Sequence, residues 1–580
     1  MWKKAPIILL ILFSLFLIRS TPAQGDTTTA DEVTLTLVGR ALNTQKAGVD
    51  EAEINIFVDG EQRVLTVAGQ ETEAAHTHAD GSYVIDLTLD QALIKSEAII
   101  IQISKSGFRT VRQDLSQAEV ACNSANCHAR IPDIVLPRVF NAAFFLATAI
   151  FVVVFGFISL NLLHETIAAL LGVAAMLGVS CFFGSSNADF WIVSFHRAIT
   201  FIDFDVIFLL MTMMIFMAIM SKTGIFQWLA YQTFRLARGN AFLVTAILVS
   251  ITGVTSAVLN DTTVMLLMAP VSIQIALALK IHPAAIVVPE VLASNIGGAA
   301  TLIGTPPNTI IGSYVGLSFN QFLGNMFPIA LMGMLILLVM TRWLYKEEFS
   351  QKSKQPSTTL IARLKKNARI TDRILLNKSL ILLIVTLVMF FTADRFRMPP
   401  AVVAIIGSSL LLLWVQPDVG EMLREVDWTT LVFFMALFMM VGGIQEVGLI
   451  QIIAEFVKRM AGENLLLAAL LMIWVSAVAS AVVANIPFTA AIVPVAVYLT
   501  QTIPGAENNV IYWALALGAG LGGNATYIGS APNIVAAGVM DRAGFRLRFQ
   551  DFSRVGVPIT FITILASTLW ILVRYFWLRF

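Results

Sequence analysis

The sequence predicts a polytopic all-α membrane protein that is preceded by a small all-β sandwich domain. Of its 580 residues, 57% are hydrophobic and only 13% are charged, whereas a soluble protein of this size carries far more charge. Runs of about 20 apolar residues, each long enough to cross a bilayer, recur from Phe140 onward. The residues before Phe140 instead alternate between polar and apolar, as strands do. The net charge of +1 indicates no nucleic-acid partner.

The first residues have the pattern of a secretory signal peptide, which we predict to span residues 1–23. Lys3 and Lys4 precede an apolar run, and the small residues around Ala23 allow cleavage after it. An uncleaved anchor is the alternative. Either form exports the residues that follow.

Residues 24–137 are predicted to form an exported β-sandwich accessory domain of about seven antiparallel strands, because apolar and polar residues alternate between turn signals. The stretch "DGSYVIDL" resembles the recurrent turn and strand of the carboxypeptidase-regulatory-like modules. Cys122 and Cys127 are close in sequence, and an exported domain lies in an oxidising compartment, so a short-loop disulfide between them is expected. We interpret the polar stretch 76–80 as a solvated loop rather than a metal site completed by His128.

Charge placement predicts the orientation of the membrane region. The hydrophilic interruption at residues 342–378 carries ten Lys and Arg against three acidic residues, so it is expected in the cytoplasm. The apolar run 140–160 then enters from outside, which places the N-terminal domain outside the cytoplasm and the protein in the cell (inner) membrane. The basic loop divides the region into membrane repeat 1 (138–341) and membrane repeat 2 (379–580).

The two membrane repeats resemble each other in sequence. Three segments of the first align with three of the second at an offset of 224 or 225 residues: 202–226 with 426–450, "SAVLNDTTVMLLMAPV" (256–271) with "SAVVANIPFTAAIVPV" (480–495), and "GGAATLIGTPPN" (297–308) with "GGNATYIGSAPN" (522–533). The repeats begin on opposite sides of the membrane, so we predict inverted repeats. Secondary transporters with this architecture place their site between the repeats, near the midplane.

Each repeat contains two interrupted apolar segments. We predict that a long helix is broken at Asn260-Asp261-Thr262 in the first repeat and near Asn485 in the second. The Gly-rich stretches ending at Asn308 and Asn533 are predicted to be re-entrant hairpins, which Pro306 and Pro532 stop from crossing. Non-helical backbone at membrane depth is tolerated where it is buried in protein or lines a cavity, and there its carbonyls can bind a cation and helix N-termini can face an anion. Close helix packing would explain the glycines but not the matched asparagines.

Two carboxylates inside the predicted membrane segments limit the kinds of substrate and coupling ion that we expect. A carboxylate at the bilayer centre costs about 2.5–3.5 kcal/mol on insertion scales, so each one needs a reason. Asp261 is aligned with the neutral Asn485, and one titratable group in a neutral pair suits proton or cation coupling. Glu290 precedes the Gly-rich stretch and is expected to orient it.

The stretch "EVLASNIGGAATLIGTPPN" strongly resembles the signature of the ion-transporter superfamily that includes NhaD-type Na⁺/H⁺ antiporters, arsenite permeases and P-protein permeases. The resemblance extends over residues 140–580. It implies a citrate-transporter-like domain with alternating access, no organic cofactor, and Na⁺ or H⁺ as the coupling ion. On this basis the expected substrate and ion site comprises Asn260, Asp261, Thr262, Ser294, Asn295, Gly297, Thr301, Thr305, Asn308, Asn485, Thr489, Asn524, Thr526, Ser530 and Asn533.

The leading functional hypothesis is therefore a secondary active transporter of a small ion, not an enzyme, with a Na⁺/H⁺ antiporter or another cation-coupled permease as its concrete form. An arsenite permease, or a permease for another small anion or carboxylate, is the first alternative. Dicarboxylate carriers of the superfamily have Ser-Asn-Thr at both tips, whereas Ile296 follows Ser294-Asn295 here, which argues against a dicarboxylate. A non-transporting membrane sensor that works through the exported domain is the alternative of a different class. The expected partners are the lipid bilayer and the small ion, with a homodimer as one assembly to test.

Overall fold

The computed structural model describes residues 32–577 except 44–47, 50–51, 59, 68–69, 79, 91–98, 106, 116–118, 124–125, 138, 161 and 351–367. The expected signal peptide lies outside the described residues, as does the middle of the basic loop. The chain divides into two compact units, residues 1–139 and 140–580, which are described separately.

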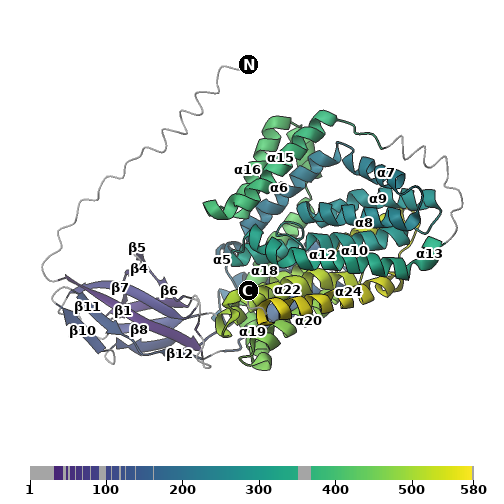
Figure 1. Cartoon of the computed structure of the whole chain (residues 1–580). Helices are drawn as coiled ribbons and strands as arrows, with labels where there is room; N and C mark the ends of the chain where they lie inside the picture. Colours follow the sequence, from purple (N-terminus) through teal and green to yellow (C-terminus); the bar gives the residue numbers. More distant parts are fainter. Residues whose placement is uncertain are drawn as a thin grey trace, which may run out of the picture. The chain divides into compact units, whose positions relative to one another are not determined.

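The first unit contains two β-sheets (Figure 1). Its strands are β1 (Glu32–Asn43), β2 (Glu53–Val58), β3 (Glu61–Gln62), β4 (Leu65–Val67), β5 (Gln70–Thr72), β6 (Ala75–His76), β7 (Ser82–Asp90), β8 (Ile99–Ser104), β9 (Val111–Asp114), β10 (Glu119–Asn123), β11 (Asn126–Arg130) and β12 (Ile134–Leu136). One sheet has the order β10-β11-β1-β7-β4-β5 with β12 on β1, and the other has the order β3-β2-β8-β9 with β6 on β2. Alternate residues of the long strands, such as Leu35, Ile54, Ile85 and Ile101, are buried in one shared core.

The pairing of β1 corrects the expectation of a purely antiparallel sandwich. β1 runs antiparallel to β7 but parallel to both β11 and β12. Alternation of polar and apolar residues predicts that a segment is a strand, but the neighbour and its direction depend on where the connecting segments lead the chain.

The second unit is helical, and among its described residues are ten helices long and apolar enough to cross a membrane. Its α-helices are α3 (Ala142–Ser159), α4 (Glu165–Val179), α5 (Phe195–Thr200), α6 (Phe204–Ser221), α7 (Ile225–Leu236), α8 (Ala241–Val258), α9 (Asp261–Leu279), α10 (Ala284–Gly298), α11 (Pro306–Val315), α12 (Phe319–Leu344), α13 (Lys346–Ser350), α15 (Arg373–Thr392), α16 (Pro400–Val415), α17 (Val419–Glu425), α18 (Trp428–Glu446), α19 (Leu449–Ala461), α20 (Leu465–Val482), α21 (Asn485–Thr502), α22 (Val510–Gly522), α23 (Ala531–Arg542) and α24 (Phe549–Ile571).

The packing of these helices repeats in the two halves. α10 lies along α8, and α22 lies along α20. α4 packs on α18 of the other half, just as α16 packs on α6. α11 packs on α21, and α23 packs on α9. The two halves therefore interlock through corresponding contacts.

The Asn260 break is the tip of a helical hairpin, which corrects the expectation of one long broken helix. α8 and α10 end at the same level, because Gly253 of α8 meets Gly297 of α10 and Ser256 lies against Gly304. α9 connects the end of α8 to the start of α10, so it runs back beside both (Figure 1). The extended backbone of Leu259 (φ −120°, ψ 161°) interrupts the helix at this reversal. α20 and α21 form the equivalent hairpin.

The Gly-rich stretch is an interrupted helix rather than the expected re-entrant hairpin. α10 ends at Gly298, residues 299–305 are not helical, and α11 begins at Pro306. α11 packs against α21 and α22 instead of running back along α10. Proline is well suited to the first turn of a helix, where no N–H partner is needed, so Pro306 starts α11 rather than ending a hairpin. In the second half the interruption lies between α22 and α23, where Pro532 is the second residue of α23.

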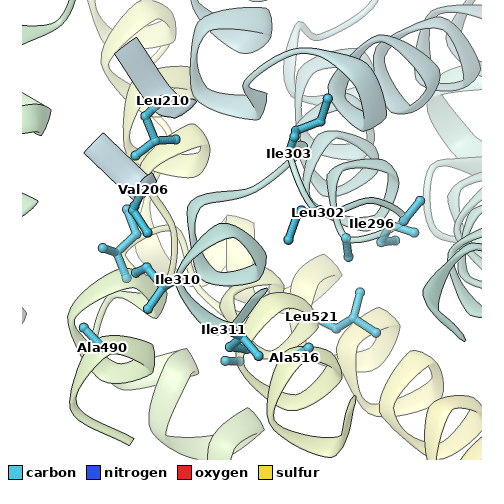
Figure 2. Close-up of a cluster of buried hydrophobic side chains, with 14 of the residues drawn as sticks. Val206, Leu210, Ile296, Leu302, Ile303, Ile310, Ile311, Ala490, Ala516 and Leu521 are labelled. Carbon is cyan, nitrogen blue, oxygen red and sulfur yellow. The ribbon is translucent and has the colours of Figure 1, made fainter. Parts of the chain in front are cut away.

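Apolar side chains pack around the first interruption. Figure 2 shows Leu302 and Ile303 of the non-helical stretch in one buried cluster with Ile310 of α11, Ala490 of α21 and Leu521 of α22. The cluster draws residues from both halves, so the interruption is buried within protein, as non-helical backbone in a membrane region must be.

Candidate functional site

The non-helical stretch between α10 and α11 is held by hydrogen bonds from two side chains. The amide nitrogen of Asn308 donates to the carbonyl oxygens of Ala299 (3.0 Å) and Thr301 (2.8 Å). The hydroxyl of Thr301 donates to the carbonyl oxygen of Ala257 at the end of α8 and accepts from the backbone N–H of Gly304 (3.1 Å). The stretch is thereby tied to the hairpin tip.

The second half contains a closely similar set of bonds, with the acceptor Thr526 at the position aligned with Thr301 and the acceptor Gly523 one residue before the position aligned with Ala299. The amide nitrogen of Asn533 donates to the carbonyl oxygens of Gly523 (2.9 Å) and Thr526 (2.9 Å). The hydroxyl of Thr526 donates to the carbonyl oxygen of Ala481 (2.6 Å), the residue aligned with Ala257. The sequence match between the repeats is therefore a match of hydrogen bonds.

The hairpin tips join the interruptions through the backbone. The N–H of Asp261, the first residue of α9, donates to the carbonyl oxygen of Gly304 (3.3 Å). The N–H of Asn485, the first residue of α21, donates to the carbonyl oxygen of Gly529 (3.0 Å). Each interruption thus meets the N-terminus of a hairpin helix, where the partial positive charge of the helix attracts anions.

The side chains at the two tips differ in charge. One carboxylate oxygen of Asp261 accepts from the N–H (2.7 Å) and the hydroxyl (3.2 Å) of Thr262, while Asn260 caps α9 by accepting from the N–H of Thr263 (3.2 Å). Asp261 is only 1% exposed, and no cationic side chain pairs with it among the described residues. At the other tip the buried Asn485 is neutral, and its backbone carbonyl oxygen accepts from the hydroxyl of Thr489 (2.7 Å).

Asn295 of α10 connects the two halves. Its amide nitrogen donates to three oxygens of the second half, Asn524 Oδ1 (2.8 Å), Ser530 Oγ (3.0 Å) and Asn533 Oδ1 (2.9 Å). All four side chains are buried. Asn295 of the first repeat and three of the residues expected in the second therefore meet in one polar cluster.

Several buried oxygens of the first half have no hydrogen-bond partner among the described residues. They are Ser256 Oγ, Ser294 Oγ, Asn295 Oδ1, Thr305 Oγ1 and Asn308 Oδ1. Leaving such an atom unpaired costs about 1–3 kcal/mol. Unpaired buried oxygens beside an unpaired carboxylate are the type of site that binds a hard cation.

Glu290 lies away from the hairpin tip, in the middle of α10. It is fully buried, and its Oε1 accepts from the hydroxyl of Thr252 on α8 (2.9 Å). This bond braces α10 against α8, so the orienting role expected for Glu290 would act through helix packing. Gly297 serves the same contact, because a Cβ there would lie 2.1 Å from the carbonyl oxygen of Gly253.

A cavity of about 350 Å³ reaches the first interruption from the ends of neighbouring helices. It is lined in part by Leu302, Thr309, Gly312, Asp205 and Arg397. The cavity lies between α6, α11 and α16, and it borders the non-helical stretch at Leu302 and α11 at Thr309, the residue after Asn308.

Sequence reasoning missed three residues that shape this site. Thr252 holds Glu290, Gly304 accepts from the Asp261 backbone, and Gly520 occupies the position aligned with Asn295. The offset of 225 residues identifies Gly520, but its significance depends on the contacts of Asn295, which the sequence does not show.

The N-terminal unit has no comparable polar site among its described residues. Cys127 is disulfide-bonded and lies opposite Cys122 in the β10–β11 ladder. No group of three metal-ligating side chains is present in the described part of the chain. Asp80 instead accepts from the N–H and hydroxyl of Ser82, and these bonds lower the pKa of its carboxyl group.

Comparison with known proteins identifies a family and several relatives of the helical unit. Residues 149–518 match the family model described as citrate transporter (CitMHS). A 46 kDa membrane protein of Mycobacterium leprae is 32% identical over 431 residues, which cover 74% of this chain and 98% of that protein. An uncharacterized transporter of Mycobacterium tuberculosis is 33% identical with the same coverage. The P protein of Homo sapiens is 32% identical over 507 residues, covering 74% of this chain and 60% of that protein.

One solved structure aligns with most of the chain. The YdaH transporter of Alcanivorax borkumensis matches with a TM-score of 0.49 and 12% sequence identity, covering 70% of this chain and 98% of that one.

The candidate membrane spans and the family match define a polytopic membrane transporter rather than an enzyme. The chain belongs to the citrate transporter (CitMHS) family. The resemblance to the ion-transporter superfamily permeases is thereby confirmed.

Proposed function

We propose that this protein is a secondary active transporter that couples transport to a small cation, Na⁺ or H⁺, bound between the hairpin tip at Asp261 and the interrupted helix at Asn308. The proposal rests on the buried carboxylate of Asp261, which has no cationic partner among the described residues, and on the buried oxygens of Thr305 and Asn308, which lack a hydrogen-bond partner there. The two segments are joined by the hydrogen bond from Asp261 N–H to the carbonyl oxygen of Gly304, the residue before Thr305. A cation would neutralise the carboxylate and use both oxygens as ligands.

Coupled transport also requires that the site change its exposure during the cycle. The site lies where two interlocked halves meet, and secondary transporters built from repeats move one bundle against another around such a site. The cavity lined in part by Leu302 and Thr309 would serve as a route for the cargo. We further propose that the N-terminal unit lies outside the cytoplasm and that the protein resides in the inner membrane.

A small anion, such as arsenite or a carboxylate, is the second candidate cargo. It is favoured by the N-termini of α9 and α11, which meet at the Asp261–Gly304 bond, and by the corresponding N-termini of α21 and α23. Helix N-termini attract anions. In this form the cation at Asp261 would drive the entry of the anion rather than be exchanged for a proton.

A transport screen of the purified protein in proteoliposomes tests these alternatives. Na⁺, Li⁺, arsenite, chloride, citrate and succinate are each offered with and without a pH gradient. Movement of Na⁺ against H⁺ supports the antiporter, and Na⁺-dependent uptake of one anion supports the second candidate. If none of them moves under any gradient, transport of these ions is refuted and the sensor hypothesis becomes the stronger one.

A further inference from the structure

Each half of the helical unit has a pair of side-chain oxygens at aligned positions. The pair in the second half has a hydrogen-bond donor, whereas the pair in the first half has none among the described residues. In the second half, Ser530 Oγ and Asn533 Oδ1 converge on one donor, the amide nitrogen of Asn295 (3.0 and 2.9 Å). The aligned atoms of the first half are Thr305 Oγ1 and Asn308 Oδ1, and both are buried without a hydrogen-bond partner among the described residues.

The geometry of the two groups corresponds because the asparagines are anchored alike. Asn308 and Asn533 each donate both amide hydrogens to two carbonyl oxygens of the adjacent interruption, at 2.8–3.0 Å. These anchors fix which side-chain atom is oxygen and where it points. Asn308 Oδ1 therefore points to a position in the first half whose equivalent in the second half, facing Asn533 Oδ1, is occupied by the Asn295 amide.

Glycine at position 520 explains why nothing from the protein fills the first group. Gly520 is aligned with Asn295, and a Cβ there would have Ala299 Cβ as its nearest neighbour, at 3.9 Å. Ala299 is aligned with Asn524, the residue that Asn295 contacts across the interface. The pair Gly520–Ala299 thus repeats the pair Asn295–Asn524, without either amide.

The charges of the hairpin tips match this difference. The filled group lies beside the neutral Asn485, whose N–H bonds the residue before Ser530. The unfilled group lies beside the carboxylate of Asp261, whose N–H bonds the residue before Thr305. The neutral amide of Asn295 thus belongs to the half whose tip has the neutral Asn485. The tip with the charged Asp261 has no cationic partner among the described residues.

We propose that the Asn295 amide takes the place of a cation in the second half, so that each chain binds a single monovalent cation, in the first half, on Thr305 Oγ1 and Asn308 Oδ1 beside Asp261. This inference rests on the proposed function and specifies the number and position of its coupling ions. The N–H₂ group and a monovalent cation are interchangeable here because both present positive charge to converging oxygens.

Binding of radioactive Na⁺ to the purified full chain tests the proposal. The wild type is expected to bind one Na⁺ per chain. Gly520→Asn would place an amide against the first group and is expected to abolish that binding, whereas the matched control Gly520→Ala, which adds only a Cβ in ordinary van der Waals contact with Ala299, retains it. Two Na⁺ per wild-type chain, or unchanged binding in Gly520→Asn, would overturn the proposal.

A gain-of-site variant provides an independent test. Asn295→Gly combined with Asn485→Asp recreates in the second half the arrangement of the first, so the folded double variant is expected to bind two Na⁺ per chain. A single ion in that variant would overturn the role given to the Asn295 amide. A wild type that transports but binds no Na⁺ refutes this inference while leaving proton-coupled transport standing, and one that binds Na⁺ but transports nothing refutes the proposed function instead.

Discussion

Replacing Asp261 by asparagine removes one negative charge from the site and little else. The oxygen that accepts from the N–H and hydroxyl of Thr262 is retained in asparagine, so the start of α9 keeps its hydrogen bonds. The aligned residue, Asn485, begins α21 in the same backbone position, which shows that the fold accommodates the neutral side chain. Asp261→Asn should therefore insert and fold.

The loss of affinity follows from the position of the charge. The Asp261 N–H donates to the carbonyl oxygen of Gly304, the residue before Thr305. For a cation held on Thr305 we take a separation of about 6 Å from the carboxylate in applying Coulomb's law. With an effective dielectric constant of about 20, one charge at about 6 Å contributes about 3 kcal/mol, which corresponds to an about 100-fold weaker cation affinity in the variant.

Thermal unfolding of the detergent-solubilised protein over a Na⁺ titration measures this change. At a Na⁺ concentration about 100 times the wild-type Kd, stabilisation by the ion should fall from about 2.7 to about 0.4 kcal/mol in Asp261→Asn. Glu347→Gln is the control, because Glu347 is an exposed acid on α13 outside the cavity and its loss should leave the titration unchanged. A Na⁺ titration of Asp261→Asn that coincides with the wild type would refute the role of this carboxylate.

Three further predictions concern the scaffold of the site and the N-terminal unit. Asn308→Ala and Asn533→Ala each remove two hydrogen bonds to buried carbonyls, so each should cost about 1–3 kcal/mol and lower the temperature of thermal inactivation; a loss in only one variant would contradict their matched roles. Gly297→Ala forces α8 and α10 apart at a cost of about 1–3 kcal/mol, measured by thermal unfolding, whereas Gly538→Ala on α23, which has no neighbour within 4 Å, should not lower stability. Cys127→Ser removes a short cross-link worth about 2 kcal/mol, so the first unit should melt earlier, and reductant should reproduce the effect in the wild type; equal melting curves would contradict it.

The sequence predicts the class of fold and the repeat because both depend on local patterns. Long apolar runs identify membrane helices, and in the matched stretches Asn308 and Asn533 each donate to two backbone carbonyl oxygens of the adjacent interruption. The contact of Asn295 with Asn524 and Asn533 is in keeping with the prediction that the two repeats meet at their interruptions.

The direction of the chain at each interruption could not be predicted. Breakers indicate where a helix ends, but whether the chain then reverses depends on contacts with distant helices. The chain reverses at Leu259 and Asn260, where there is neither proline nor glycine. It reverses there because α10 packs along α8. Gly298 and Pro306 bound a non-helical stretch that does not reverse, because α11 finds its partner in α21. The same reasoning applies to β1, whose parallel neighbours come from a segment far along the chain.

Uptake of Na⁺ into proteoliposomes that contain only the purified wild-type protein tests whether transport depends on a cation bound at Asp261, Thr305 and Asn308. With a pH gradient imposed across the membrane, a cation-coupled transporter should accumulate Na⁺ or drive a small anion with it, and the uptake should be lost in Asp261→Asn. If Na⁺ neither moves nor changes the movement of any offered ion, and no proton flux accompanies transport, the account of a cation bound at Asp261, Thr305 and Asn308 is contradicted.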